Sequence, residues 1–170
     1  MHSSDIGKAV ESVEQYLQTQ SAPGPRADVP ATAIIEDGLR CRIESPDGSA
    51  IYTDMPKSIG GSATANSPGW NLRAALASCD ATLLAMRAAR LGLKVNSIEV
   101  RVEATSDGRG MFLDEGVLPG SPEMHLYFKI AATDVSREAI EDLVHWVEQH
   151  SPVGSDVSRA VDLSNEIELS

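Results

Sequence analysis

Cys79 is the residue of this chain whose type and position best suit nucleophilic or redox chemistry. It stands in the run ASCDATLLAM, within a long segment rich in alanine and leucine. A thiol attacks as its thiolate, a form that a helix N-terminus or a neighbouring cation favours. The predicted helix begins near Pro68, and the effect of its dipole fades within the first turn. A reactive Cys79 therefore requires an arginine brought in from elsewhere.

Several arginines could supply this cation, and the sequence does not choose among them. The candidates are Arg40 and Arg42 in the first predicted strand, Arg26 in the linker before it, and Arg73 and Arg87 on the helix itself. The alternative is that Cys79 only fills the core, because it lies on an apolar stripe and a free cysteine packs as a small hydrophobe. Spacing alone leaves both interpretations open.

Cys41 is the other thiol of the sequence. It lies on the apolar face of a predicted strand, where packing is again the simplest role. Two cysteines allow at most one internal disulfide, and the chain starts with neither a basic leader nor an apolar segment. These features indicate a reducing cytoplasm, in which a cysteine serves packing, metal binding or redox chemistry.

Other chemistries lack their residue patterns. The sequence contains no CxxC or HxxxH pair, and His145 and His150 lie about 140° apart around a helix, so no metal site is expected. The run IGGSATA does not match the GxSxG spacing of a serine hydrolase. The glycine-rich loops that bind nucleotides are missing too. We therefore expect neither a metal nor a cofactor.

The charge balance excludes a further class of function. The 170 residues include 14 Lys and Arg against 25 Asp and Glu, a formal net charge of −11. Nucleic-acid binding depends mostly on clustered basic residues, so no nucleic-acid partner is expected. No apolar run approaches the roughly 18 to 20 residues of a membrane span, so no membrane association is expected either.

Three regions are predicted along the chain. Residues 1–18 contain an amphipathic helix, residues 19–31 form a proline-rich linker, and residues 32–170 form the main domain. Near the start of this domain, alternating residues around Cys41 predict a strand. The turn sequence SPDGS then leads the strand into a hairpin.

The longest helical pattern begins at Pro68 or Gly69 and ends near Leu91, with Gly92 as a candidate C-cap. Its predicted apolar stripe consists of Leu72, Ala75, Leu76, Cys79, Leu83 and Met86. Alanines fill many of the remaining positions, and a helix that is small and apolar on most faces belongs in a core. We expect this helix at the centre of the fold.

Alternating patterns beyond this helix predict further strands. Apolar and polar residues alternate at 98–104 and at 124–130, and a final strand is predicted at 161–169. A helix capped by Ser136 and stopped by Pro152 precedes the final strand. This order of elements predicts an α+β fold in which antiparallel or mixed sheets pack on helices.

The segment from Asp54 to Ala104 resembles the OsmC/Ohr family of thiol-dependent hydroperoxide reductases. The likeness consists of Asp-Met-Pro before a Gly-Gly loop, a Ser-Pro start to a long alanine- and leucine-rich helix, a mid-helix cysteine, and a Gly-Leu turn into an alternating strand. The run HSPVGSDVSRAVDLSNEIEL is similar to the closing helix and strand of the family. The resemblance covers residues 30 to 170 and leaves the N-terminal helix outside.

This resemblance implies an intertwined α+β homodimer, in which long central helices are wrapped by sheets of both chains. It also implies that Cys79 is the peroxidatic cysteine, which attacks a hydroperoxide and becomes a sulfenic acid. Arg40 or Arg42 is then expected to stabilise the thiolate and the departing alkoxide. Leu76 and Leu83 are expected to receive the alkyl tail of the peroxide in a pocket at the dimer interface.

Two positions depart from the family pattern. A second cysteine in a Cys-Pro-Val segment normally resolves the sulfenic acid, but here that segment begins with Ser151. The Asn-Pro-Glu start of the helix ends here in Gly69, so the glutamate that orients the arginine is missing. A lone sulfenic acid must be reduced by an external thiol, or it overoxidises. Cys41 is a candidate substitute resolving thiol, provided that its Cα lies within about 7 Å of that of Cys79.

The leading hypothesis is therefore a thiol-dependent hydroperoxide reductase, or a peroxide-responsive protein, that acts through Cys79 alone. Its substrate is an organic hydroperoxide and its reductant is an external thiol. The alternative is a non-catalytic protein of the same fold that binds a small apolar ligand or a protein partner, since both departures fall on catalytic machinery. A third hypothesis gives the N-terminal helix control of access to the pocket.

Overall fold

The computed structural model describes residues 3–19, 24–113, 116–159 and 161–169. It has the α+β architecture that the sequence predicts, with two antiparallel sheets. Among the described residues, no helix combines the length and the apolar character needed to cross a bilayer. The elements in chain order are α1 (Ser3–Thr19), β1 (Thr32–Asp37), β2 (Arg40–Glu44), β3 (Ala50–Thr53), η1 (Lys57–Ile59), α2 (Pro68–Arg90), β4 (Val95–Ala104), α3 (Arg109–Phe112), β5 (Met124–Ala132), α4 (Arg137–His150) and α5 (Pro152–Ser158).

The chain divides into two compact units. The first unit consists of residues 13–74, and the second consists of residues 1–12 together with residues 75–170. The first unit contains the sheet β1–β2–β3, and the second contains the ribbon β4–β5 with helices α4 and α5. Cys79 belongs to the second unit, whereas Cys41 and the two strand arginines belong to the first.

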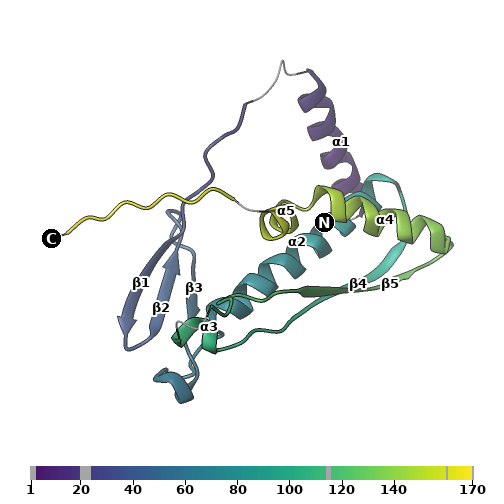
Figure 1. Cartoon of the computed structure of the whole chain (residues 1–170). Coiled ribbons are helices and arrows are strands. Elements are labelled where there is room, and N and C mark those ends of the chain that lie inside the picture. Colours follow the sequence, from purple (N-terminus) through teal and green to yellow (C-terminus); the bar gives the residue numbers. More distant parts are fainter. Residues whose placement is uncertain (1–2, 20–23, 114–115, 160, 170) are drawn as a thin grey trace. The chain divides into compact units, whose positions relative to one another are not determined.

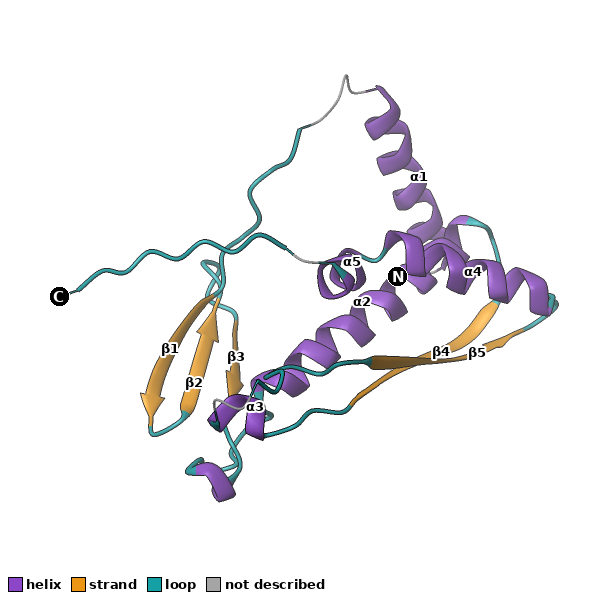
Figure 2. Ribbon diagram, viewed as in Figure 1, coloured by secondary structure: helices purple, strands orange, loops and turns teal. Residues whose placement is uncertain are grey.

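The first unit is built on the sheet β1–β2–β3, in which neighbouring strands run antiparallel (Figure 2). Gly38 and Gly48 adopt φ values of 56° and 87° in the two connecting turns, a conformation that glycine reaches without strain. Asp47 Oδ1 accepts hydrogen bonds from the amide and the hydroxyl of Ser49, at 2.9 and 2.7 Å. The predicted hairpin is therefore confirmed.

One face of this sheet is apolar and exposed. Ile35 pairs with Cys41, and Ile43 pairs with Ile51, so these four residues share a face. Ile35 and Ile51 are both largely exposed. Arg42, one position along β2 from Cys41, points to the opposite face. Exposed apolar patches are typical of surfaces at which proteins interact.

Helix α2 begins and ends where the sequence predicts. Ser67 Oγ accepts a hydrogen bond from the Trp70 amide at 3.3 Å, as a helix cap does. Pro68 occupies the first turn, where a missing amide hydrogen costs nothing. Gly92 has a φ of 68°, the left-handed conformation that commonly closes a helix. The chemistry of these two ends thus fixes the position of the helix in the sequence.

The core of the second unit lies between α2, α4 and the β4–β5 ribbon (Figure 1). Leu84 and Ala88 of α2 meet Leu143 and Val147 of α4, and all four are almost completely buried. Apolar side chains of the two strands pack against this cluster, namely Val95, Ile98, Val100, Phe128 and Ile130. The other face of the ribbon is polar and exposed, which confirms the predicted alternation.

The buried face of α2 differs from the predicted stripe. Leu72 and Met86 belong to that stripe and are exposed, whereas the buried positions are Leu76, Asp80, Leu84 and Ala88. Alanines on every side make the apolar periodicity ambiguous, and a polar residue occupies the centre of the buried face. Within one chain the helix is therefore buried along a single face rather than all round.

The strand predicted over 161–169 is not formed. These residues are extended, as Figure 2 shows, and pair with no described strand. Leu163, Ile167 and Leu169 are 88%, 85% and 91% exposed. Their alternate positions do carry a strand pattern, but a strand forms only where a sheet edge accepts its hydrogen bonds.

Candidate functional site

Cys79 lies half-buried near the middle of α2, with a hydroxyl beside its sulfur. Ser151 Oγ donates a hydrogen bond to Cys79 Sγ at a distance of 3.5 Å. Ser151 is the residue that stands where the resemblance places a second cysteine. A donor that reaches a sulfur favours the charged form of the thiol. The structure therefore brings these two positions of the chain together.

Ser151 is held by the two helices that it joins. Its amide donates to the Val147 carbonyl at 2.9 Å and so ends α4. Its Oγ accepts a hydrogen bond from the Gly154 amide at 2.9 Å and so caps α5. Pro152 occupies the first position of α5, which its fixed φ suits. Ser151 is only 4% exposed, so its hydroxyl is confined between α5 and Cys79.

Asp80 is the buried acid of this site. It is 2% exposed, and its Oδ1 accepts no hydrogen bond from any described residue. Burial raises the pKa of Asp80; a side-chain hydrogen bond with Ser151 opposes this rise, and the charge of Glu148 adds to it. Sequence reasoning missed Asp80 because an aspartate in a helix is normally assigned to the exposed face.

Leu76 and Leu83, the predicted substrate contacts, both pack within the second unit. Leu76 is almost completely buried, and its Cδ1 lies 3.7 Å from the position that a Cβ would take on Gly154. Leu83 is half-buried and packs against the core cluster around Leu84. Both side chains thus support the helix around Cys79, and their contact with a substrate stays a prediction.

Arg40 and Arg42 lie in the first unit and differ in how far their charges are compensated. Arg42 pairs with Glu36 at 2.9 Å and also with Glu44. Arg40 lies 3.8 Å from Glu36, and its guanidinium stacks over the ring of Tyr52 at 4.3 Å. Two close carboxylates neutralise Arg42 more fully, so Arg40 is the better partner for a further anion.

A second buried acid holds Arg40 in place. Arg40 Nη1 donates to Thr64 Oγ1 at 2.7 Å, and Thr64 Oγ1 donates in turn to Asp54 Oδ2 at 2.8 Å. Asp54 also accepts hydrogen bonds from the amides of Met55, Ser62 and Thr64. Thr64, through its amide and then its hydroxyl, is the main cause that lowers the pKa of Asp54 to about 2. Asp54 is thus an ionised anchor for the guanidinium.

Cys41 occupies β2 between the two arginines and therefore faces the other side of the sheet. Its Sγ lies 3.8 Å from the Arg42 carbonyl oxygen. Both Cys41 and Cys79 are free thiols. The resolving role of Cys41 stays a prediction.

The arginines of α2 have other surroundings. The Arg87 guanidinium lies over the ring of Trp146, 4.9 Å from its centroid. Arg73 Nη1 lies 3.9 Å from the position that a Cβ would take on Gly69. Arg26, in the linker, is exposed. Arg87 is thus directed toward α4, and Arg73 toward Gly69 at the start of α2.

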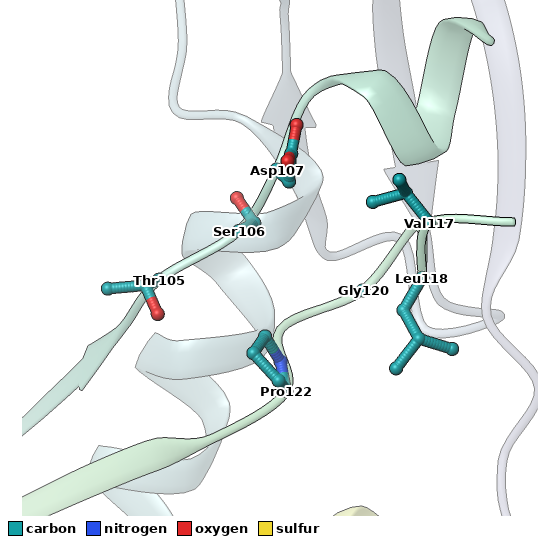
Figure 3. Close-up of a pocket in the computed structure, with 7 residues that line it drawn as sticks. All are labelled: Thr105, Ser106, Asp107, Val117, Leu118, Gly120 and Pro122. Atoms are coloured by element: carbon teal, nitrogen blue, oxygen red, sulfur yellow. The ribbon is translucent and has the colours of Figure 1, made fainter. Parts of the chain in front are cut away.

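The second unit also has an open pocket, which Figure 3 shows between the end of β4 and the loop before β5. Its volume is about 410 Å³, and its lining residues are Thr105, Ser106, Asp107, Val117, Leu118, Gly120 and Pro122. The acid of this pocket, Asp107, pairs with Arg109 at 2.6 Å. None of the predicted site residues lines the pocket, so it is separate from the chemistry considered above. Across the part of the chain that the structure describes, no three His, Cys, Asp or Glu side chains gather as metal ligands do.

Comparison with known proteins places the chain among others of the same architecture. A sequence model of the family described as OsmC-like protein matches residues 60–166. No curated protein matches the chain. The solved structure of an OsmC-like protein from Mycoplasma pneumoniae is similar, with 18% identity, a TM-score of 0.66 and coverage of 79% of this chain and 89% of that one.

Two further solved structures carry names that refer to hydroperoxides. An organic hydroperoxide resistance protein OsmC from Legionella pneumophila has 17% identity, a TM-score of 0.57 and coverage of 79% of this chain and 91% of that one. The organic hydroperoxide resistance protein OhrB of Bacillus subtilis has 20% identity, a TM-score of 0.50 and coverage of 76% and 89%. At these identities the likeness shows a shared fold.

Proposed function

The chain belongs to the OsmC-like protein family, and we propose that it reduces organic hydroperoxides through the thiol of Cys79. The names of the similar Legionella and Bacillus proteins support a peroxide-related role. The observation that carries the proposal is the hydrogen bond of 3.5 Å from Ser151 Oγ to the half-buried Cys79 Sγ. A donor there stabilises negative charge on the sulfur, which a cysteine that only fills space does not need.

In the first half of the proposed reaction, the Cys79 thiolate attacks the distal oxygen of the hydroperoxide. The S–O bond forms as the O–O bond breaks, and the alkoxide leaves and takes up a proton to become the alcohol. The sulfur gives up an electron pair and becomes a sulfenic acid, while the peroxide is reduced by the same pair.

In the second half, an external thiol reduces the sulfenic acid. It attacks the Cys79 sulfur, water leaves, and a mixed disulfide forms; a second external thiol then releases Cys79 and leaves as part of a disulfide. Ser151 cannot replace this reductant, because a hydroxyl forms no disulfide. We assign this reduction to an external thiol rather than to Cys41, which lies on the face of β2 opposite to Arg40.

We assign Arg40 to the thiolate and to the departing alkoxide. The chain of hydrogen bonds from Asp54 through Thr64 fixes its guanidinium, and a fixed guanidinium loses little freedom when it binds an anion. Arg40→Met is expected to slow the reaction of Cys79 with a hydroperoxide on the order of a hundredfold. Arg42→Met, on the same strand face but already paired with two glutamates, is the matched control with a smaller loss.

The alkyl tail of the hydroperoxide is assigned to Leu76 and Leu83. These residues lie three positions before and four positions after Cys79 on α2, and such positions share a helix face. Leu76→Ala and Leu83→Ala are expected to raise the KM for a bulky organic hydroperoxide more than that for hydrogen peroxide. Equal effects on both substrates would remove this assignment.

We also propose that the protein works as a homodimer in the cytoplasm. Residues 161–169 carry a strand pattern but pair with no described strand, and Ile35 and Ile51 leave an apolar sheet face exposed. A second copy of the chain supplies a sheet edge for the strand pattern and covers the apolar face, and burial of apolar surface drives the association. Removal of 161–170 is expected to shift sedimentation toward the monomer. A cytoplasmic location suits a chain whose two cysteines are both free.

The proposed function is tested with Cys79→Ala and Cys41→Ala as a matched pair. Consumption of cumene hydroperoxide in the presence of dithiothreitol is measured for both variants. Cys79→Ala is expected to abolish consumption, and Cys41→Ala to retain it. Equal consumption by the two variants would remove the proposal and leave a non-catalytic protein that binds a small apolar ligand or a protein partner.

A further inference from the structure

Ser151 has a single hydroxyl hydrogen and two neighbours that can accept it. Its Oγ lies 3.5 Å from Cys79 Sγ. Burial raises the pKa of Asp80, and the Ser151 side chain is also close enough to that carboxyl to oppose the rise through hydrogen bonding. One lone pair of the Oγ is taken by the Gly154 amide at 2.9 Å. The hydrogen and the second lone pair remain for Cys79 and Asp80. Ser151 and Asp80 are 4% and 2% exposed, so solvent has little access to either.

We propose that Asp80 is a positioning residue whose proton decides which neighbour receives the Ser151 hydrogen. A protonated Asp80 donates to the second lone pair of Ser151 Oγ, and the hydroxyl then donates to the Cys79 sulfur. An ionised Asp80 accepts the hydroxyl hydrogen itself, and the sulfur faces an oxygen lone pair. The inference rests on the proposed function in that it takes Cys79 as the nucleophile.

The surroundings of Asp80 disfavour its ionised form relative to a carboxyl in water, so it titrates at a higher pH than usual. Its Oδ1 has no hydrogen-bond partner among the described residues, and both burial and the charge of Glu148 on α4 raise its pKa. Glu148 itself lies 3.4 Å from His145. Asp156, the acid of α5, pairs with Arg159 at 2.9 Å. The described groups that act on Asp80 are thus a hydroxyl and an acid, without a compensating cation.

Ionisation of Asp80 disfavours the Cys79 thiolate in two ways. It withdraws the hydrogen bond from the sulfur, and it places a second negative charge beside it. A neutral group at position 80 has the opposite effect. The rate at which Cys79 is alkylated follows its thiolate fraction, so this rate reports the state of Asp80 without any peroxide.

The primary test is Asp80→Asn in a Cys41→Ala background, where Cys79 is the only thiol. The amide has the shape of the acid but cannot ionise, so it leaves the Ser151 hydrogen on the sulfur at every pH. The rate of alkylation by iodoacetamide is measured against pH. We expect a midpoint at lower pH than in the parent and alkylation near neutral pH faster on the order of threefold to tenfold. An unchanged midpoint would overturn the proposal.

Asp142→Asn is the matched control, because Asp142 is an exposed acid on α4. It is expected to leave the midpoint where it is in the parent. The same Asp80→Asn change is then made on a Ser151→Ala background, which removes the hydroxyl. Its effect is expected to be clearly smaller there, because only the direct effect of the Asp80 charge remains once the hydroxyl is gone. An undiminished effect would show that the charge of Asp80 acts alone and would overturn the proposed route through Ser151.

A second measurement does not depend on the folding of the Asp80 variant. The titration of Asp80 is followed by NMR of carboxyl-labelled aspartate in the parent and in Cys79→Ala. Coupling between two sites is reciprocal, so removal of the sulfur frees the Ser151 hydrogen for the carboxylate and lowers the titration midpoint of Asp80. An equal midpoint in the two proteins would contradict the proposal.

Failure of this inference is distinguishable from failure of the proposed function. Alkylation and NMR test the Asp80 switch, whereas consumption of cumene hydroperoxide tests the peroxidase. A chain that consumes peroxide but keeps its alkylation midpoint in Asp80→Asn would lose only the switch. A chain with the expected midpoint shift and no peroxide consumption would lose only the proposed activity.

Discussion

Asp54 and Asp80 are equally buried, at 2% exposure each, yet their pKa values move in opposite directions. Asp54 receives hydrogen bonds from three backbone amides and one hydroxyl. Asp80 has one neighbouring hydroxyl, that of Ser151, which it shares with Cys79. Its Oδ1 has no partner among the described residues. At Asp54 the hydrogen-bond donors outweigh desolvation and lower the pKa, whereas at Asp80 desolvation is the largest cause and raises the pKa.

The local backbone explains this difference in donors. Asp54 precedes a loop, and a loop can turn its free amides toward a carboxylate. Asp80 lies inside α2, where every backbone amide already donates to the carbonyl one turn earlier. A buried acid in mid-helix must therefore find side-chain donors or keep its proton. The loop acid serves as an anchor for Arg40, and the helix acid remains able to titrate beside Cys79.

Ser151→Cys is expected to give the largest change in this comparison. It places a thiol where the one hydroxyl shared by Cys79 and Asp80 now lies, 3.5 Å from the sulfur. One equivalent of organic hydroperoxide should then yield a disulfide between positions 79 and 151, read by peptide mapping without reductant. The lost hydroxyl cap of α5 costs about 1 kcal/mol of stability.

The control for this prediction is the same change in a Cys79→Ala background, which should form no internal disulfide between these positions. Persistence of both thiols in Ser151→Cys after peroxide treatment would contradict the account. It would mean either that Cys79 is not oxidised or that the two side chains do not meet.

Asp54→Asn tests the anchored side of the comparison. The variant should unfold at lower urea than the parent at neutral pH, and looser positioning of Arg40 should slow peroxide reduction on the order of tenfold. The pKa of Asp54 falls from 3.8 to about 2 on folding, so its stabilisation is complete above pH 3.8 and is lost as the pH falls through about 2. Urea denaturation at a series of pH values should show the gap between parent and variant closing over that window. A gap that persists at the acid end would contradict the role of the Asp54 charge.

Thr64→Val separates the anchor from its link to Arg40. The change keeps the shape of the side chain but removes the hydroxyl between Asp54 Oδ2 and Arg40 Nη1. A loss of about 1 to 2 kcal/mol in the free energy of unfolding is expected. Thr82→Val, on an exposed position of α2, is the matched control with no comparable loss. Equal losses in the two variants would show that the hydroxyl of Thr64 has no special role.

Asp80→Asn is expected to have the smallest effect on stability, and the opposite sign to Asp54→Asn. The pKa of Asp80 is raised above 3.8, so the folded parent is favoured below pH 3.8 and loses stability as the pH rises through the raised value. The variant avoids this loss and should be more stable than the parent by about 1 kcal/mol at pH values above the raised pKa of Asp80. Urea denaturation measures this difference in stability, which should vanish below pH 3.8. A variant less stable than the parent above the raised pKa would contradict the comparison.

The ends and faces of the elements could be predicted from the sequence where local chemistry decides them. Pro68 and Gly92 bound α2, and the Ser136 side chain accepts from the Ala139 amide at 3.1 Å to cap α4, as predicted. The alternation of β4 and β5 also determines which of their faces packs on the core. These signals act over a few residues and need no knowledge of the rest of the fold.

The remaining features depend on contacts between distant residues. Nothing local marks Asp80 as buried, because its burial results from the packing of α4 and the turn at Ser151 against α2. The strand pattern at 161–169 is present, but its formation depends on a sheet edge that the pattern does not encode. The link from Asp54 through Thr64 to Arg40 joins residues far apart in the sequence, so motif spacing alone could not reveal it.

The central claim is that the Cys79 sulfur is the atom that a hydroperoxide oxidises. The most direct measurement is intact-protein and peptide mass spectrometry after one equivalent of cumene hydroperoxide is added in the presence of dimedone, which traps sulfenic acids. The account predicts a dimedone adduct on Cys79 in the parent and in Cys41→Ala, with no adduct at position 79 in Cys79→Ala. An unmodified Cys79 in a sample whose hydroperoxide remains unconsumed would contradict it.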